Sequence, residues 1–116
     1  MHQFKELLIW KKSRLFFSKI YNITANFPNE EKFGIANQLR RAAVSIPSNI
    51  AEGASRNSNK DFARFLEIAI GSAYEVETQF LISSDLGFIN EENITELINL
   101  LEEITKMTSK FRATLL

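Results

Sequence analysis

Residue types that usually carry catalysis are scarce in this 116-residue sequence. His2 is the only histidine, and cysteine is absent. A serine–histidine–aspartate triad, a catalytic zinc site and a di-iron bundle built on Glu-x-x-His pairs all need histidine in the body of the chain. Glycine-rich loops that bind phosphates in nucleotide-binding proteins are also missing. We therefore expect a protein that is not an enzyme, with no catalytic residues, no metal and no cofactor.

Carboxylates are the remaining groups with acid–base potential. Glu77 falls within the apolar arc of its predicted helix, and burying an unpaired carboxylate costs several kcal/mol. Antiparallel pairing of the two central helices, turning near residue 57, would place Arg40 close to it. The sequence therefore predicts a structural ion pair between Arg40 and Glu77. The alternative is an enzyme that uses Glu52, Glu75 or Glu77 at a subunit interface.

A polar face on the second predicted helix is the main candidate for an interface or a ligand site. Its side chains recur at intervals of four, three and four residues, so they lie along one side of the helix. The mixed charges suit a contact between subunits or a groove for a peptide or nucleic acid, and a solvated face is the alternative. The candidates on this helix and the next are Arg41, Ser45, Ser48, Asn49, Glu52, Arg64 and Glu75.

Pro47 lies inside the same helix. It lacks the N–H that would bond the carbonyl of Ala43, and its ring should bend the helix there. The bend would wrap the helix around its neighbours; alternatively, a break would expose backbone acceptors to a ligand or partner. The assumed hairpin register also sets Ala43 opposite Gly71, two small residues that would let the helices approach closely.

The first predicted helix carries two further sets of candidates. Lys5, Lys12 and Lys19 recur every seven residues and form a basic edge that could contact nucleic-acid phosphates, with a solvated edge as the alternative. Leu8 and Leu15 lie opposite the main apolar stripe. They are candidate contacts between copies of the chain, or else isolated surface leucines.

Charge is balanced overall but unevenly distributed. Fourteen basic and fourteen acidic side chains give a net charge of zero. Residues 1–26 carry five basic side chains against one acidic, whereas residues 57–116 carry five against ten. The bulk charge gives no support for nucleic-acid binding, and the basic first helix keeps that function open.

The elements that must position these residues are helices. Apolar residues recur at spacings of three and four, and the two prolines and four glycines fall mainly where helices should begin, bend or end. The stretch from Ser58 to Asp61 resembles a capping box, and Leu86-Gly87-Phe88 resembles a Schellman stop. These signals predict a single domain, 1–116, that folds as an all-α, antiparallel up-down-up-down four-helix bundle. Its helices should cover about residues 4–26, 30–54, 59–86 and 91–115.

Targeting and membrane segments are not expected. No apolar run is long enough for the core of a signal peptide, or for a membrane span of about 18 apolar residues. The lack of cysteine suits a reducing compartment. We therefore expect a soluble, cytoplasmic protein with no membrane partner.

Two long stretches carry a family resemblance: residues 38–53 (QLRRAAVSIPSNIAEG) and residues 65–79 (FLEIAIGSAYEVETQ). Shorter matches are Leu8 to Trp10, Tyr21 with Phe27-Pro28, Phe33-Gly34, and Leu86 to Ile89. The chain resembles, over nearly its whole length, the bacterial four helix bundle proteins. These are also called 23S rRNA intervening sequence proteins or S23 ribosomal proteins.

The resemblance implies a left-handed, antiparallel four-helix bundle that assembles into a ring-like homopentamer without catalytic residues. Some members are encoded within insertions in 23S rRNA genes. We therefore expect a non-enzymatic, homo-oligomeric binding or scaffolding module, with RNA or a ribonucleoprotein as its candidate partner. The alternative is a nucleic-acid-binding protein similar to the basic, pentameric accessory protein of diversity-generating retroelements. This chain differs from that relative in its zero net charge.

Overall fold

The computed structural model describes residues 2–116, and all secondary structure within that range is helical. The four α-helices are α1 (Leu8–Thr24), α2 (Ile35–Ala54), α3 (Asn59–Asp85) and α4 (Glu91–Thr114). Two one-turn 3-10 helices, η1 (Phe4–Glu6) and η2 (Asn29–Glu31), precede α1 and α2. The prediction of an all-α, four-helix fold is confirmed.

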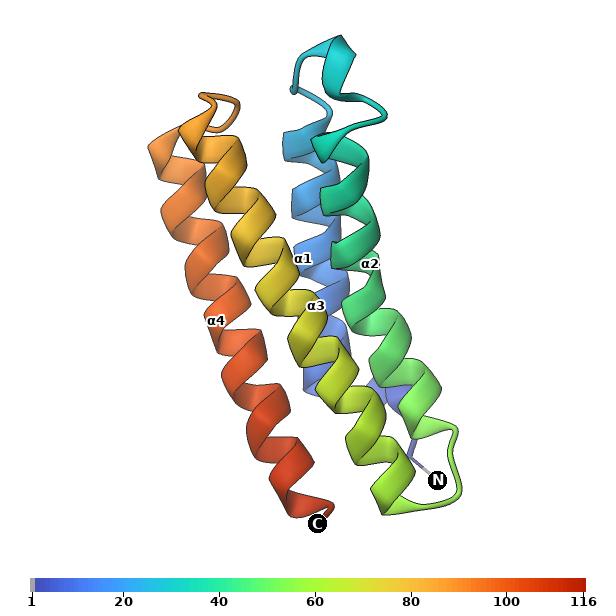
Figure 1. Ribbon diagram of the computed structural model, residues 1–116. Helices are drawn as coiled ribbons and strands as arrows, with labels where there is room; N and C mark the ends of the chain where they lie inside the picture. The colour runs from blue at the N-terminus through green and yellow to red at the C-terminus, as the bar shows by residue number, and fades with distance from the viewer. Residues whose placement is uncertain (1) are drawn as a thin grey trace.

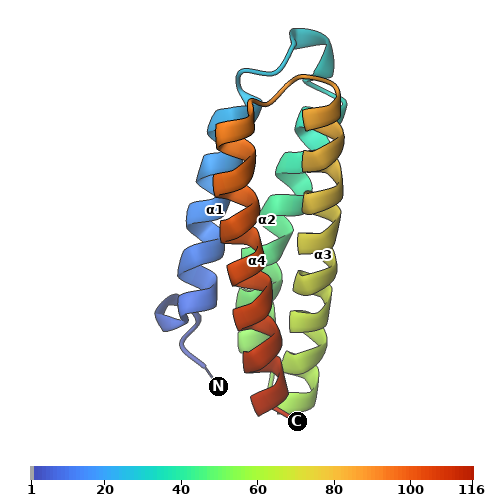
Figure 2. The ribbon, with the colours of Figure 1, turned by 90° about the vertical axis from the view of Figure 1, so that its left-hand side faces the viewer.

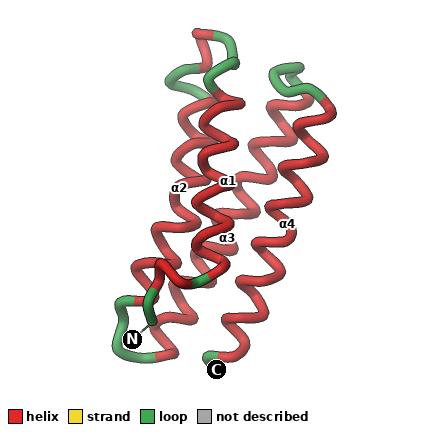
Figure 3. Tube along the Cα trace, turned by 180° about the vertical axis from the view of Figure 1, so that it is seen from behind, coloured by secondary structure: helices red, strands yellow, loops and turns green. Residues whose placement is uncertain are grey.

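The helices lie side by side, and the chain reverses direction at each of the three loops that join them (Figures 1, 2 and 3). Each helix contacts two others: α1 and α3 both pack against α2 and α4. In the described part of the chain, no Cα atoms of α1 and α3 come within 8 Å of each other. These two helices therefore occupy diagonal corners of the bundle, and their outward faces point in opposite directions.

The core is built from the apolar positions that the three–four spacing predicts. In α2, Leu39, Ala43, Ile46 and Ile50 are each at most 1 % exposed. Burying one such large side chain stabilises the fold by about 1.5 to 3 kcal/mol relative to leaving it in water. The other helices contribute the remaining large, fully buried side chains: Phe16, Ile20, Phe62, Leu66, Val76, Phe80, Leu101 and Ile104.

Two helix ends follow the sequence signals closely. The Ser58 hydroxyl accepts a hydrogen bond from the Asp61 backbone N–H at 3.1 Å, which caps α3. At the other end of α3, Gly87 adopts a φ of 80°. The N–H of Phe88 bonds the carbonyl of Ser83, and the N–H of Gly87 bonds that of Ser84. This is the Schellman pattern, which depends on a residue that tolerates positive φ.

The first two predicted helices are shorter than expected. Leu7 is extended, with φ −72° and ψ 126°, and separates η1 from α1, which ends at Thr24 rather than near residue 26. The second helix does not begin near residue 30. The acidic residues after Pro28 form only the 3-10 turn η2, and Gly34, at φ −104° and ψ −121°, leaves the helical region before α2 starts at Ile35.

Ala43 and Gly71 do not form the expected close contact. Ala43 is buried, but Gly71 is exposed, and a Cβ added there would meet no atom within 4 Å. The hydrogen bond between Ser45 and Ser72, 2.8 Å long, sets a hairpin register about three residues away from the assumed one. The close approach lies at Gly53 instead, where an added Cβ would stand 2.7 Å from the Phe65 Cβ.

Candidate functional site

Arg40 is held against α1. Its Nε donates to the Thr24 hydroxyl at 2.7 Å, and its Nη2 donates to the Tyr21 carbonyl at 3.2 Å. The guanidinium carbon lies 3.8 Å from the centre of the Tyr21 ring, a close cation–π contact. Three interactions with one neighbouring helix therefore fix the position of this side chain.

The predicted ion pair between Arg40 and Glu77 is wrong. Glu77 is half-buried and lines a hollow with side chains of α4, among them Lys106. The hairpin register brings residues 40 and 77 to about the same level, but the two side chains leave on opposite sides: Arg40 toward α1 and Glu77 toward α4. No carboxylate among residues 2–116 forms an ion pair with Arg40 or with Arg41.

The polar face of α2 is divided between the interior and the surface. Ser45 and Asn49 are half-buried: the Asn49 amide donates to the Ser45 carbonyl and hydroxyl, and Ser45 bonds Ser72 of α3. The other candidates are exposed, and no ligand-sized site joins them. They are Arg41, Ser48 and Glu52 on α2, where Glu52 pairs with Arg56 at 3.5 Å, and Arg64 and Glu75 on α3. Four of the seven thus bond to other side chains or to backbone of the α2–α3 hairpin, since Glu75 also accepts a hydrogen bond from Gln79 at 3.2 Å.

Pro47 is buried within α2, which runs without interruption from Ile35 to Ala54. The alternative of a broken helix that exposes its backbone acceptors is therefore wrong. The predicted bend stays a prediction.

The lysine row on α1 is largely neutralised. Lys12 pairs with Glu103, and Lys19 pairs with Glu96 at 3.0 Å, so both lysines face α4. Lys5 is exposed but lies on η1, beyond the break at Leu7. The prediction of a continuous basic edge for phosphates is wrong, because acidic residues of the adjacent helix fall at matching intervals of seven.

The outward face of α1 keeps the two leucines that the sequence singled out. Leu8 and Leu15 are about half exposed, at 53 % and 51 %. Lys11 and Arg14 are exposed between them on the same helix and form no ion pair within residues 2–116. This face is therefore apolar and positively charged.

A longer apolar stripe on α3 was missed by the sequence analysis. Four large apolar side chains of this helix and that of its C-cap residue, Leu86, are between 44 and 62 % exposed; the four are Ile68, Tyr74, Leu81 and Ile82. By contrast, none of the large apolar side chains within Glu91–Thr114 of α4 is exposed. The signal in the sequence was two pairs of apolar residues outside the core positions of α3, namely Tyr74 with Leu81, seven residues apart, and Ile68 with Ile82, fourteen residues apart.

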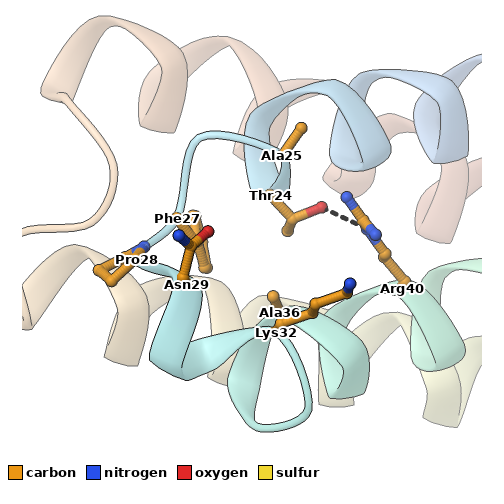
Figure 4. Close-up of a pocket in the computed structure, with 8 residues that line it drawn as sticks. All are labelled: Thr24, Ala25, Phe27, Pro28, Asn29, Lys32, Ala36 and Arg40. Carbon is orange, nitrogen blue, oxygen red and sulfur yellow. Dashed lines mark hydrogen bonds between the residues drawn. The ribbon is translucent and has the colours of Figure 1, made fainter.

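A small pocket opens where α1 turns into α2 (Figure 4). Its volume is about 230 Å³. Phe27, Pro28 and Ala36 form its apolar part, while Lys32 and Arg40 extend toward each other across it. Thr24, Ala25 and Asn29 complete the lining, so the pocket contains two cationic side chains and no carboxylate. Sequence reasoning missed it because Lys32 lies in the segment that was wrongly assigned to a continuous helix.

The structure also bears on metal binding and on membrane crossing. Residues 2–116 contain no cluster of three or more histidine, aspartate or glutamate side chains placed to hold a metal ion. None of the helices in that range combines the length and the apolar character that a membrane crossing requires.

Four helices packed around one apolar core place the chain in the all-α, four-helix class. The chain belongs to the 23S rRNA-intervening sequence protein family, whose model matches residues 5–110, and the family indicated by the sequence is thereby confirmed. A crystal structure of a protein with unknown function from the S23 ribosomal protein family of Bacteroides thetaiotaomicron has a similar fold, with a TM-score of 0.85 and 29 % sequence identity. The match covers 91 % of this chain and 96 % of that one. No curated protein matches the sequence.

Proposed function

We propose that this protein is a non-enzymatic, cytoplasmic scaffold that works as a homo-oligomer, a ring of five copies, and binds RNA or a ribonucleoprotein. The bundle would have the left-handed, antiparallel packing that the family resemblance implies, and the chain reversals in Figure 1 support the antiparallel part. RNA is the partner class suggested by the family name.

The exposed apolar stripe on α3 carries the proposal. Four large exposed apolar side chains within α3 form an unusual surface for an isolated small protein, and such patches mark interaction sites. The helix α4 acts as an internal comparison, because its outward face carries no exposed large apolar side chain over Glu91–Thr114. Because α3 and α4 are neighbours of similar length but differ in exposed apolar side chains, we infer that the outward face of α3 contacts a partner and that the outward face of α4 contacts water.

Two different faces of the chain are suited to each other. The α1 face is apolar and positive, with Leu8, Leu15, Lys11 and Arg14. The α3 face is apolar and carries exposed Glu75 and Asp85 without an ion pair among residues 2–116, whereas Glu67 on this helix pairs with Arg112 at 3.6 Å. These faces lie at diagonal corners of the bundle. Contacts between unlike faces of a subunit join copies head to tail, and such contacts form a ring when the rotation from one copy to the next closes after a whole number of subunits.

Sedimentation velocity on paired variants tests this assignment. The double variant Ile68→Glu/Ile82→Glu places two charges in the apolar stripe, while the control Asn99→Glu/Ser109→Glu places the same charges on the exposed face of α4. We expect the stripe variant to sediment as a monomer and the control to sediment as the native assembly does. Circular dichroism verifies that both variants are folded. A stripe variant that is folded and still assembles like the native protein would refute the role of this face.

A further inference from the structure

We propose that the pocket between the end of α1 and the start of α2 binds a phosphate group, with Lys32 and Arg40 as its ligands. The pocket lies within one chain, so this site does not depend on the assembly proposed above. Both free phosphate monoesters and the phosphodiesters of a nucleic acid could supply this phosphate group. The titrations distinguish these two kinds of ligand.

The charge of the pocket is the first argument. Lys32 and Arg40 extend toward each other across the opening (Figure 4). Neither side chain forms an ion pair with a carboxylate anywhere in the described residues. Two cations that converge without an anion repel each other, and an anion placed between them converts this repulsion into two attractions.

The rigidity of Arg40 is the second argument. Its Nε bonds Thr24, its Nη2 bonds the Tyr21 carbonyl, and its guanidinium lies against the Tyr21 ring. Two of its five N–H donors are thereby used to fix the group, and the others stay available. A ligand group that is already fixed loses little conformational entropy when the anion arrives, and this favours binding.

The size of the pocket is the third argument. Its volume of about 230 Å³ lies below the roughly 300 Å³ at which pockets for whole small molecules begin. A single anionic group fits this space better than a complete cofactor. A carboxylate offers its two oxygens to one guanidinium fork, whereas a tetrahedral phosphate has enough oxygens for both cations. The apolar side chains of Phe27, Pro28 and Ala36 would lie against the organic part of a phosphate ester.

Nuclear magnetic resonance titrations of the full chain at low salt test the proposal. The signals to follow are the Arg40 Nε–H and the backbone amides of Thr24 and Asn29. The ligands are inorganic phosphate, a ribonucleoside 5′-monophosphate, a short single-stranded RNA with a 5′-hydroxyl, and sodium acetate. The variants are Lys32→Gln, which changes an exposed side chain, and Arg40→Gln. The control is Lys60→Gln, an exposed lysine in the first turn of α3.

We expect phosphate to shift these signals saturably. Lys32→Gln and Arg40→Gln should each weaken the affinity roughly ten-fold, because each removes a charge-assisted hydrogen bond to the anion, and Lys60→Gln should leave it within about two-fold. Tighter binding of the monophosphate than of the RNA identifies a phosphate monoester as the ligand, and the reverse identifies a phosphodiester. Shifts that do not saturate, equal affinity for acetate, or an equal loss in Lys60→Gln would overturn the proposal.

Discussion

Replacing either of two helical glycines by alanine should change stability in opposite directions. Gly53 of α2 faces α3, where an added Cβ would lie 2.7 Å from the Phe65 Cβ and 2.8 Å from the Phe62 Cδ1. Gly71 of α3 is exposed, and an added Cβ there would meet nothing within 4 Å. Both substitutions add one methyl group to a helix, so they differ only in surroundings.

The packing geometry gives the size of each effect. Carbon atoms of different residues make their best contact at about 3.5 to 4.0 Å, so the new methyl at Gly53 overlaps its neighbours by nearly 1 Å. The Phe65 Cβ is attached directly to backbone, and the Phe62 ring is buried and packs edge-on against Phe111 at 5.5 Å. Neither can easily move. Overpacking of this kind costs about 1 to 3 kcal/mol, and alanine returns up to about 1 kcal/mol of helix propensity.

We therefore expect Gly53→Ala to lower the free energy of unfolding by about 1 to 2 kcal/mol. Gly71→Ala should raise it by about 0.5 to 1 kcal/mol. Urea unfolding followed by circular dichroism, at one fixed chain concentration, measures both. The corresponding thermal midpoints should move apart by several degrees. The packing argument is refuted if Gly53→Ala is as stable as the native chain, or if the two variants change stability in the same direction.

Three further substitutions test separate features, each by the same urea unfolding. Ser58→Ala removes the hydroxyl that caps α3 and should cost about 1 kcal/mol, whereas a loss near zero would mean that the cap contributes nothing. Leu39→Ala empties a fully buried position and should cost about 2 to 5 kcal/mol; a cost below 1 kcal/mol would contradict the assigned core. Lys19→Gln removes a surface ion pair with Glu96 and should cost less than about 1 kcal/mol, and a larger loss would show that this pair is not merely a surface contact.

The helices and the core could be predicted from the sequence because they depend on local patterns. The three–four spacing of apolar residues placed Leu39, Ile46 and Ile50 in the interior, and the side-chain cap at Ser58 and the glycine stop at Gly87 were visible as short motifs. Helix ends that depend on backbone conformation alone were harder to predict from the sequence. Leu7 interrupts a segment whose composition favours helix, and nothing local marks it as a break, whereas the glycine at position 34 was a signal that the prediction of a helix from about residue 30 did not use.

The candidate site was less predictable because it depends on which neighbour each polar side chain faces. A shift of about three residues in the α2–α3 register moved Gly71 away from Ala43, and the rotation of α2 turned Arg40 toward Thr24 instead of Glu77. The sequence alone left Lys12 and Lys19 of α1 free to contact phosphates. In the structure, Glu103 and Glu96 of α4 lie beside them and form ion pairs with them. Pairings between segments far apart in sequence are set by the packing of whole helices, which residue spacing within one helix does not reveal.

The mass of the native protein in solution tests the central claim most directly. Multi-angle light scattering, on the unmodified chain at micromolar concentration, measures this mass without reference to molecular shape. The proposed ring predicts a mass of five times the 13.3 kDa of one chain. A mass of 13.3 kDa throughout the micromolar range would contradict the assembly and leave the exposed faces of α1 and α3 without the partner proposed for them.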